Sequence, residues 1–422
     1  MSSASTPPID YDRDAVQKRT LRVLWGTAIL SRGAISTMFP VSVLAIKEIL
    51  GSSTWAGLST GFSTIGSALS AAWLATYMQR TGRAPGLTGG FAIAAVGGLL
   101  AILAIQLSTL VLFLPAMVLI GTGSGTANLS RYAAADLATE ERRSREISTV
   151  IFASTFGAVI FPLFIGVAGT FAESISLDEN AGGFMIAILF FVLAAGIIWL
   201  WMRPDPLVVA GGVDPNASRK DTVPFMQAVR IAMAHPLARL AFFALVIGQA
   251  VMVGVMAMTP LHMDAHGHGN GIIGAVISAH TAGMFALAPI AGWLSDNRGR
   301  IPTIALGGVT LVLATTLTAL AGEAPEALMF PGLFLLGLGW SFTIVAGSAL
   351  LTESVELGDR VAVQGAADLA TNVASGCGAL ISGLVLSMSG FHTLSFIGMA
   401  AAGGLLVQAF FQYRLAENRA AF

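Results

Sequence analysis

Two pairs of soft metal-ligand side chains stand in neighbouring apolar segments of the second half of the chain. Met252 and Met256 form the first pair, and His280 and Met284 form the second, each with the spacing i, i+4. Side chains at this spacing lie on one face of a helix, and thioether with imidazole is a ligand set that favours Cu(I). The alternative interpretation is that the methionines fill gaps between packed helices, and that the histidine bonds a neighbouring helix or relays protons.

The composition predicts an integral membrane protein. Only 11% of the residues are charged, 55% are hydrophobic, and the mean hydropathy is +0.78. The net charge of −1 gives no indication of a nucleic-acid partner. The single cysteine, Cys377, excludes an intrachain disulfide and argues against a thiolate metal cage. The sequence has neither a Walker motif nor an HExxH motif, so we expect no enzymatic activity and no cofactor.

Apolar stretches long enough to cross a bilayer as a helix recur along the whole chain. Divided at charged and Gly/Pro-rich joints, they predict twelve transmembrane helices near 20–45, 55–78, 86–106, 109–131, 147–171, 183–202, 237–262, 271–294, 302–321, 326–352, 362–388 and 392–415. The longest polar joint lies at the centre, and Trp73 and Gly82 in the first half correspond to Trp293 and Gly299 in the second, at an offset near 217 residues. We therefore expect an all-α membrane protein made of two six-helix pseudo-repeats.

The basic residues predict the orientation of these helices. With both termini inside, every Lys and Arg except Arg32 and Lys47 falls in a cytoplasmic segment or at a cytoplasmic helix end, as the positive-inside rule requires. The expected organisation is a cytoplasmic tail at 1–19, a six-helix bundle at 20–202, a cytoplasmic linker at 203–236, a second bundle at 237–415 and a cytoplasmic tail at 416–422.

The joint between the predicted eighth and ninth helices carries a recognisable loop motif. Gly292, Asp296, Gly299 and Arg300 match the pattern Gly-x-Leu-x-Asp-x-x-Gly-Arg, which resembles the loop motif of the major facilitator superfamily. The resemblance implies a transporter of twelve helices, with the acid and the base of this loop bridging helix ends and releasing them as the two halves rock. The copy in the first half lacks the acid and retains Gly82 and Arg83.

Within that superfamily, the Met-xxx-Met and His-xxx-Met pairs resemble the CcoA-like copper importers that supply cytochrome oxidase assembly in bacteria. This resemblance implies uptake of copper, as transported substrate, across a bacterial inner membrane, with Met252, Met256, His280 and Met284 as ligands. The partners expected are copper or another small solute and the lipid bilayer, and the protein is expected to be monomeric. This chain departs from the copper importers in having one cysteine rather than several.

Helix geometry allows a separate estimate of whether the four side chains can meet. If the two helices run in opposite directions, a rise of 1.5 Å per residue brings Met252 and His280 to nearly the same depth, roughly 13–15 Å below the outer surface. The loop above them holds His262, Met263, His266 and His268, which form a possible metal entrance. A solvated glycine-rich turn is the alternative interpretation of that loop.

Two charged residues are candidates for gating or coupling. Arg32 falls near the middle of the first predicted helix, where a charge is costly unless it faces a cavity or a partner. It would serve an anionic substrate, pair with an acid, or bond polar groups of the helix bundle. Asp368 lies near the inner end of the eleventh helix, where it packs against the loops or couples to protons. With a partial Gly157–Pro162 motif, these residues support the alternative function of a proton-coupled organic-solute or drug exporter.

Overall fold

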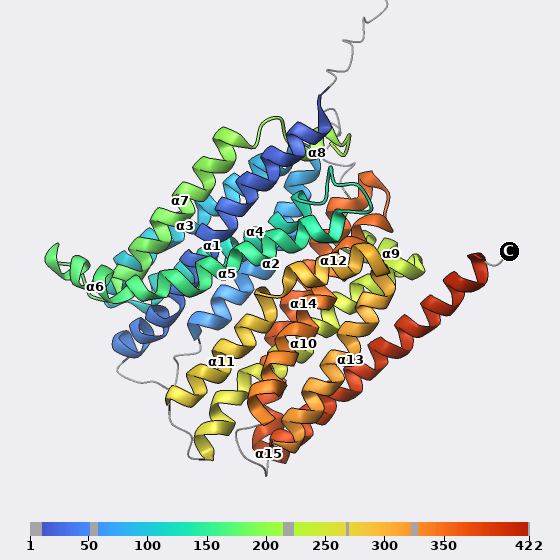
Figure 1. Cartoon of the computed structure of the whole chain (residues 1–422). Coiled ribbons are helices and arrows are strands. Elements are labelled where there is room, and N and C mark those ends of the chain that lie inside the picture. Colours follow the sequence, from blue (N-terminus) through green and yellow to red (C-terminus); the bar gives the residue numbers. More distant parts are fainter. Residues whose placement is uncertain (1–10, 51–57, 214–222, 267–269, 322–327, 421–422) are drawn as a thin grey trace, which may run out of the picture.

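The computed structural model describes residues 11–50, 58–213, 223–266, 270–321 and 328–420, and within these ranges the regular structure is entirely helical (Figure 1). The first half contains α1 (Arg13–Leu50), α2 (Leu58–Thr81), α3 (Arg83–Gln106), α4 (Leu110–Ala133), α5 (Arg143–Ile160), the 3-10 turn η2 (Phe161–Phe164), α6 (Ile165–Ser174) and α7 (Ala181–Trp201). The second half contains α10 (Pro236–Ala265), α11 (Asn270–Phe285), α12 (Ala288–Arg298), α13 (Arg300–Leu320), α14 (Met329–Glu353) and α15 (Leu357–Ala420).

These elements form the predicted all-α architecture of twelve transmembrane helices in two six-helix halves. In the described residues, ten helices are long and apolar enough to cross a membrane. α5, η2 and α6 together make one of them, and so do α11 and α12. The other two are α2 and the part of α15 before Gly390, whose positive φ of 79° divides that segment into two helices. Both carry buried polar residues, such as Ser67 and Ser70 in α2 and Gln364 and Asp368 in α15.

The helix ends differ from the predicted spans at several places. α1 begins at Arg13 instead of residue 20, and α15 continues to Ala420 instead of ending at 415. The predicted linker is not all loop, since it contains α8 (Pro206–Val209) and α9 (Phe225–Ala234). Hydropathy detects the hydrocarbon boundary, whereas hydrogen bonding carries a helix beyond that boundary into polar surroundings.

Each half has its own buried core. In the first half, Phe91 stacks on Phe191 at 6.0 Å and Phe113 meets Phe184 edge-on at 6.1 Å. Small residues let the helix backbones approach closely there, as expected in a bilayer. A Cβ added to Gly66 in α2 would lie only 1.9 Å from the carbonyl oxygen of Val118 in α4. The second half is packed around a separate cluster that includes Leu245, Leu311, Leu336, Val345 and Leu405.

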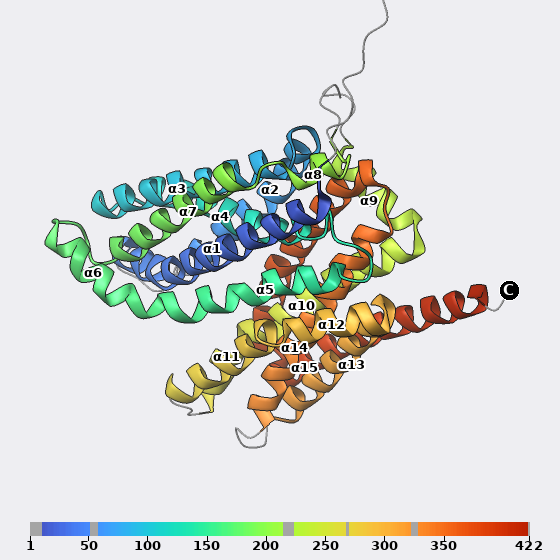
Figure 2. The same cartoon turned by 45° about the horizontal axis from the view of Figure 1, so that its top comes forward.

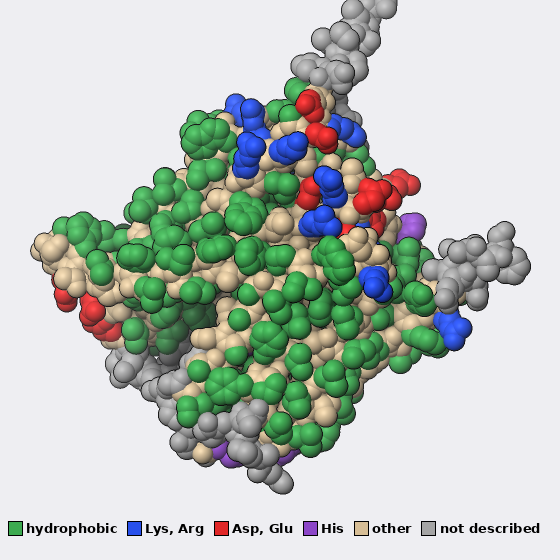
Figure 3. Space-filling view, viewed as in Figure 1, with side chains coloured by type: hydrophobic (Ala, Val, Ile, Leu, Met, Phe, Trp, Pro, Cys, Tyr) green, Lys and Arg blue, Asp and Glu red, His purple; other side chains and the backbone are tan. Residues whose placement is uncertain are grey.

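The two halves converge at one end of the molecule and diverge at the other (Figures 1 and 2). Lys, Arg, Asp and Glu side chains gather at the end where the halves converge, while the flanks of the molecule are covered by hydrophobic side chains (Figure 3). We call this the charged end. Figure 3 also shows a hollow between the two halves on the side away from it. The fold thus leaves space between the halves at one end and closes it at the other.

Candidate functional site

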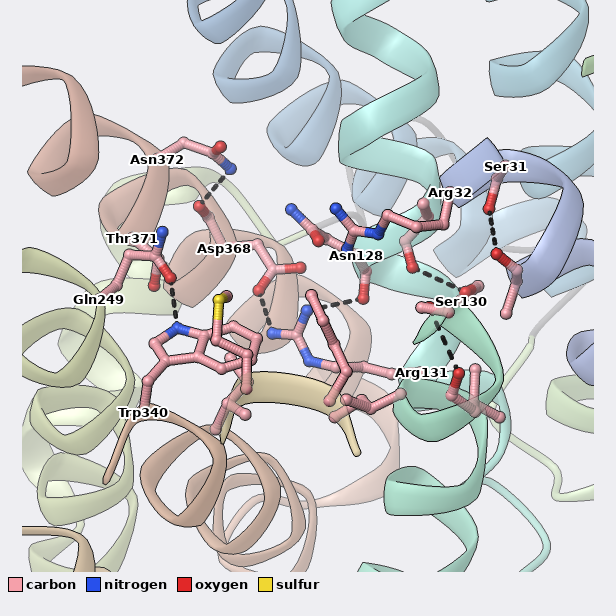
Figure 4. Close-up of a pocket in the computed structure, with 18 of the residues that line it drawn as sticks. Ser31, Arg32, Asn128, Ser130, Arg131, Gln249, Trp340, Asp368, Thr371 and Asn372 are labelled. Carbon is pink, nitrogen blue, oxygen red and sulfur yellow. Dashed lines mark hydrogen bonds and ion pairs between the residues drawn. The ribbon is translucent and has the colours of Figure 1, made fainter. Parts of the chain in front are cut away.

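A cavity of about 190 Å³ lies between the two halves (Figure 4). The first half contributes lining residues from α1, α4 and α5, and the second half contributes residues from α10, α11, α14 and α15. Its polar lining includes Arg32, Asn128, Arg131, Gln249, Asp368 and Asn372, and its apolar lining includes Met252, Met284, Phe285 and Trp340. A site with many hydrogen-bonding groups and two aromatic rings is therefore built from both halves.

Arg131 and Asp368 join the two halves within this lining. The Nη2 atom of Arg131 in α4 lies 2.5 Å from Oδ1 of Asp368 in α15, and both side chains are buried. Arg131 also donates from Nε to Ser348 Oγ at 3.1 Å and from Nη1 to the carbonyl oxygen of Asn128 at 2.7 Å. Asp368 Oδ2 is buried without a hydrogen-bond partner among the described residues. The two opposite charges neutralise each other in a bridge between the halves, and Oδ2 of Asp368 is left free to accept a hydrogen bond or a proton.

Arg32 is a second cation in the same lining, and its surroundings are different. Its guanidinium lies 5.1 Å from the ring centroid of Phe285, which belongs to the opposite half. Its Nε atom is buried and has no hydrogen-bond partner among the described residues. No carboxylate of the described residues lies within ion-pair distance of it, in contrast to Arg131. Its positive charge is therefore not balanced within the cavity.

The four predicted metal ligands are only partly brought together. Met252 and Met284 both line the cavity. His280 is buried instead against α14, where its Nδ1 atom lies 2.9 Å from the carbonyl oxygen of Leu333. Met256 packs against the core of the second half and is not among the lining residues. The structure holds two of the four side chains at one cavity, and their binding of copper remains a prediction.

The position of His280 follows from the close packing of α11 on α14. A Cβ added to Gly337 in α14 would lie 2.3 Å from the carbonyl oxygen of His280 and 2.8 Å from the backbone nitrogen of Met284. Glycine at this position lets α14 approach the backbone of α11 closely. This contact fixes the rotation of α11 about its own axis. His280 therefore contacts α14, while Met284, four residues later, lines the cavity.

The predicted metal entrance is more helical than expected. His262 and Met263 lie within α10, and Met263 is buried. The ring of His262 stacks on Phe391 at 4.2 Å and contacts the ring of His266 at 4.3 Å. His266 is exposed, while His268 lies outside the described residues. Two imidazoles therefore stand together at this end of α10, and their role as an entrance remains a prediction.

Comparison with known proteins decides the family of this chain. The model of the Major Facilitator Superfamily matches residues 24–275 and 263–421. The chain belongs to the major facilitator superfamily. It is 33% identical over 384 residues to the uncharacterized MFS-type transporter YdeG of Bacillus subtilis, covering 91% of this chain and 89% of the relative.

Two further comparisons are more distant. The riboflavin transporter RfnT of Brucella anthropi is 26% identical over 341 residues, which are 81% of this chain and 82% of that protein. Among solved structures, the human organic anion transporter MFSD10 superposes with a TM-score of 0.75 at 16% identity, covering 96% of this chain and 99% of the other. The second comparison shows the facilitator fold alone. As a facilitator, the protein is a multi-pass secondary transporter, and the comparisons leave its substrate open.

The facilitator loop motif closes the charged end between the halves. The two carboxylate oxygens of Asp296 accept hydrogen bonds from the backbone N–H groups of Ser144 at 3.0 Å and Arg145 at 2.9 Å, in the first turn of α5. An acid at this position is favourable because the first turn of a helix has free N–H groups and a partial positive charge. Arg300 pairs with Asp296 at 2.6 Å and with Glu353 at 2.9 Å.

The two motif glycines have specific steric roles. Gly299 has a φ of 97°, a backbone conformation that side chains disfavour. A Cβ added to Gly292 would lie 2.1 Å from Ser148 Oγ in α5, so the bare backbone of α12 is needed for the two halves to meet there. Arg300 and Asp296 are therefore placed where the motif predicts an acid and a base bridging helix ends.

Sequence reasoning missed the counterpart of this network in the first half. Arg83 is fully buried and pairs with Asp136 at 2.8 Å, and it also donates to Gln364 of the other half at 2.7 Å. Arg83 and Asp136 stand 217 residues before Arg300 and Glu353, so the offset of the pseudo-repeat contained the signal. Sequence reasoning also missed the pairing of Arg131 with Asp368, which is a buried bridge between the halves.

Proposed function

We propose that this facilitator carries a small polar organic solute through the cavity between its halves, driven by the proton gradient across a bacterial inner membrane. The observation that supports the proposal best is the lining itself, to which both halves contribute hydrogen-bonding and aromatic side chains. Such groups suit a solute with several polar atoms and a planar part. With the charged end in the cytoplasm, as the basic residues predict, the present conformation is outward-facing.

The lining also contains the elements needed for alternating access. A solute bound by residues of both halves favours states in which the halves surround it, because binding shifts a conformational equilibrium only through differential contacts. Trp340 of α14 donates its indole N–H to Oε1 of Gln249 in α10 at 2.6 Å, which fixes one wall of the cavity. The name of the distant relative RfnT, a riboflavin transporter, supports a solute that is both polar and aromatic.

Transport by membrane vesicles tests this proposal. Vesicles with and without the protein are given a defined mixture of riboflavin, aromatic carboxylates and sugars, with and without a pH gradient, and their contents are compared. We expect at least one solute to move in a manner that depends on the gradient. Gln249→Leu should weaken that transport, whereas Thr76→Ala, on the exposed face of α2, should leave it unchanged. Movement of copper alone would contradict the proposal.

Copper import is the second candidate, favoured by the placement of Met252 and Met284 on the same cavity. His280 adds some support. A carbonyl oxygen only accepts hydrogen bonds, so its contact with Leu333 requires Nδ1 to carry the proton. The lone pair of the neutral ring is then on Nε2, and metal-binding histidines commonly have their other nitrogen held in this way. In this case the cargo would be Cu(I), bound mainly by thioethers.

Uptake of radioactive copper by whole cells decides this candidate. Substituting Met252→Leu and Met284→Leu together removes both cavity thioethers while keeping their volume. Met388→Leu is the matched control because Met388 is 82% exposed on the outer surface. Uptake that is lost in the double variant and kept in the control would support copper as cargo. Equal copper uptake in all three proteins and in cells without the protein would exclude it.

A further inference from the structure

We propose that the cavity selects solutes that carry an anionic group beside a planar ring, and that Arg32 is the residue that binds the anion. The inference rests on the proposed function as an organic-solute carrier and deepens it, because it names the chemical class of the solute. It starts from the charges that line the cavity, which are Arg32, Arg131 and Asp368.

These three charges do not balance. Asp368 is already paired with Arg131 at 2.5 Å, and Arg131 has further hydrogen-bond acceptors in Ser348 and the backbone of Asn128. Arg32 has no carboxylate partner in the part of the chain that the structure describes, and its Nε atom is buried without an acceptor. The cavity lining therefore carries one positive charge that no described carboxylate compensates.

A charge in this position is expensive, and the cost must be offset when the protein works. Intramembrane arginines normally pair with another group or line a pathway for a charged ligand. The planar guanidinium presents paired N–H donors that match the two oxygens of a carboxylate or phosphate group. Figure 4 shows Arg32 and the amide of Asn128 reaching into the same space. An anionic group of the solute placed there meets donors from both α1 and α4.

The other half of the protein supplies an aromatic wall beside this cation. Phe285 lies 5.1 Å from the guanidinium of Arg32 and contacts Trp340 edge-on, with ring centroids 5.8 Å apart. Aromatic rings pair favourably in offset or edge-to-face arrangements, so a planar ring of the solute can pack against these two. A solute with both features would bind α1 of one half and α11 and α14 of the other. Its binding would thus link the two halves.

Matched pairs of acids and amides test the inference with the purified full-length protein in detergent. The probes are naphthalene-2-carboxylate and naphthalene-2-carboxamide, which have the same ring and differ in charge. Binding is followed as the increase in thermal unfolding temperature over a range of probe concentrations. For the unmodified protein we expect the carboxylate to bind at least about tenfold more tightly than the amide, as a charge-assisted hydrogen bond would give.

The variants then assign the preference to one residue. Arg32→Gln should remove the preference for the carboxylate, and Arg32→Lys should retain part of it. Arg145→Gln, which removes an exposed cation at the charged end, should retain all of it. Equal binding of acid and amide by the unmodified protein, or an unchanged preference in Arg32→Gln, would overturn the inference while leaving the organic-solute proposal intact. No binding of either probe would count against both.

Discussion

Asp368 in α15 and Arg131 in α4 are 237 residues apart in the sequence, and their side chains form a buried ion pair of 2.5 Å that joins the two halves. The pair is at the edge of the cavity, beside Asn128 and Ser348. Protonation of Asp368 would remove the attraction that holds the halves together at this point. We therefore expect the pair to connect proton binding with the opening of the charged end.

We expect Asp368→Asn to lower the free energy of unfolding by about 3–5 kcal/mol, because it leaves Arg131 buried without its counter-charge. The double variant Arg131→Met/Asp368→Leu should be more stable than Asp368→Asn, since it removes both charges together. Thermal unfolding of the purified proteins measures both effects. If the double variant is the least stable of the set, the two side chains stabilise the fold by more than the neutralisation of each other's charge. In vesicles, Asp368→Asn should also abolish any dependence of transport on a pH gradient.

When no solute is bound, substitution of Arg32 should change the free energy of unfolding in the opposite direction to substitution of Arg131. Replacing Arg32 by Met removes an uncompensated charge from the cavity, so we expect the free energy of unfolding to rise by about 1–3 kcal/mol. Arg131→Met should lower it, because Asp368 then loses its partner. The comparison requires chemical denaturation of both variants in the same detergent. A loss of stability in Arg32→Met would mean that Arg32 has a structural role.

Asp296 should hold the charged end closed. Asp296→Asn weakens the hydrogen bonds to the first turn of α5 and the pair with Arg300. We expect this to shift the equilibrium by about 1–2 kcal/mol toward the state in which the charged end is open. A cysteine at Ser130, in a protein with Cys377→Ser, reports this opening. In inverted vesicles a membrane-impermeant maleimide should label it faster in Asp296→Asn. Glu173→Gln is the matched control, and equal labelling in both variants would contradict the expectation.

A single methyl group at Gly365 should disturb the contact between α15 and α2. A Cβ there would lie 2.2 Å from Ala75 Cβ, whereas one at Gly358 in the same helix would meet no atom within 4 Å. We expect Gly365→Ala to separate the halves at the charged end and Gly358→Ala to leave them unchanged. Spin labels at Arg142 and Arg298 would measure this distance. If the two variants give the same distance distribution, the close approach of these helices is not required for closure.

Much of the fold could be predicted from the sequence for simple physical reasons. Each transmembrane helix must be apolar over the thickness of the hydrocarbon core, so hydropathy located the helices, although several of them extend beyond the predicted ends. The loop around Asp296 and Arg300 resembles the facilitator motif, and that resemblance implied an acid and a base that bridge helix ends. The sequence also identified Arg32 and Asp368 as unusual, since charges are rare within such helices.

The side chains that line the cavity could not be predicted in this way. The spacing of His280 and Met284 determines that they share a face of α11, but it does not determine which neighbour that face meets. In lipid the hydrophobic effect does not choose the rotation of an apolar helix, and close packing against small residues does so instead. Gly337 brings α14 against α11 and places His280 beside Leu333, while Met284 faces the cavity. The sequence thus determined which helices form and what chemistry they carry, and tertiary packing decided which side chains meet.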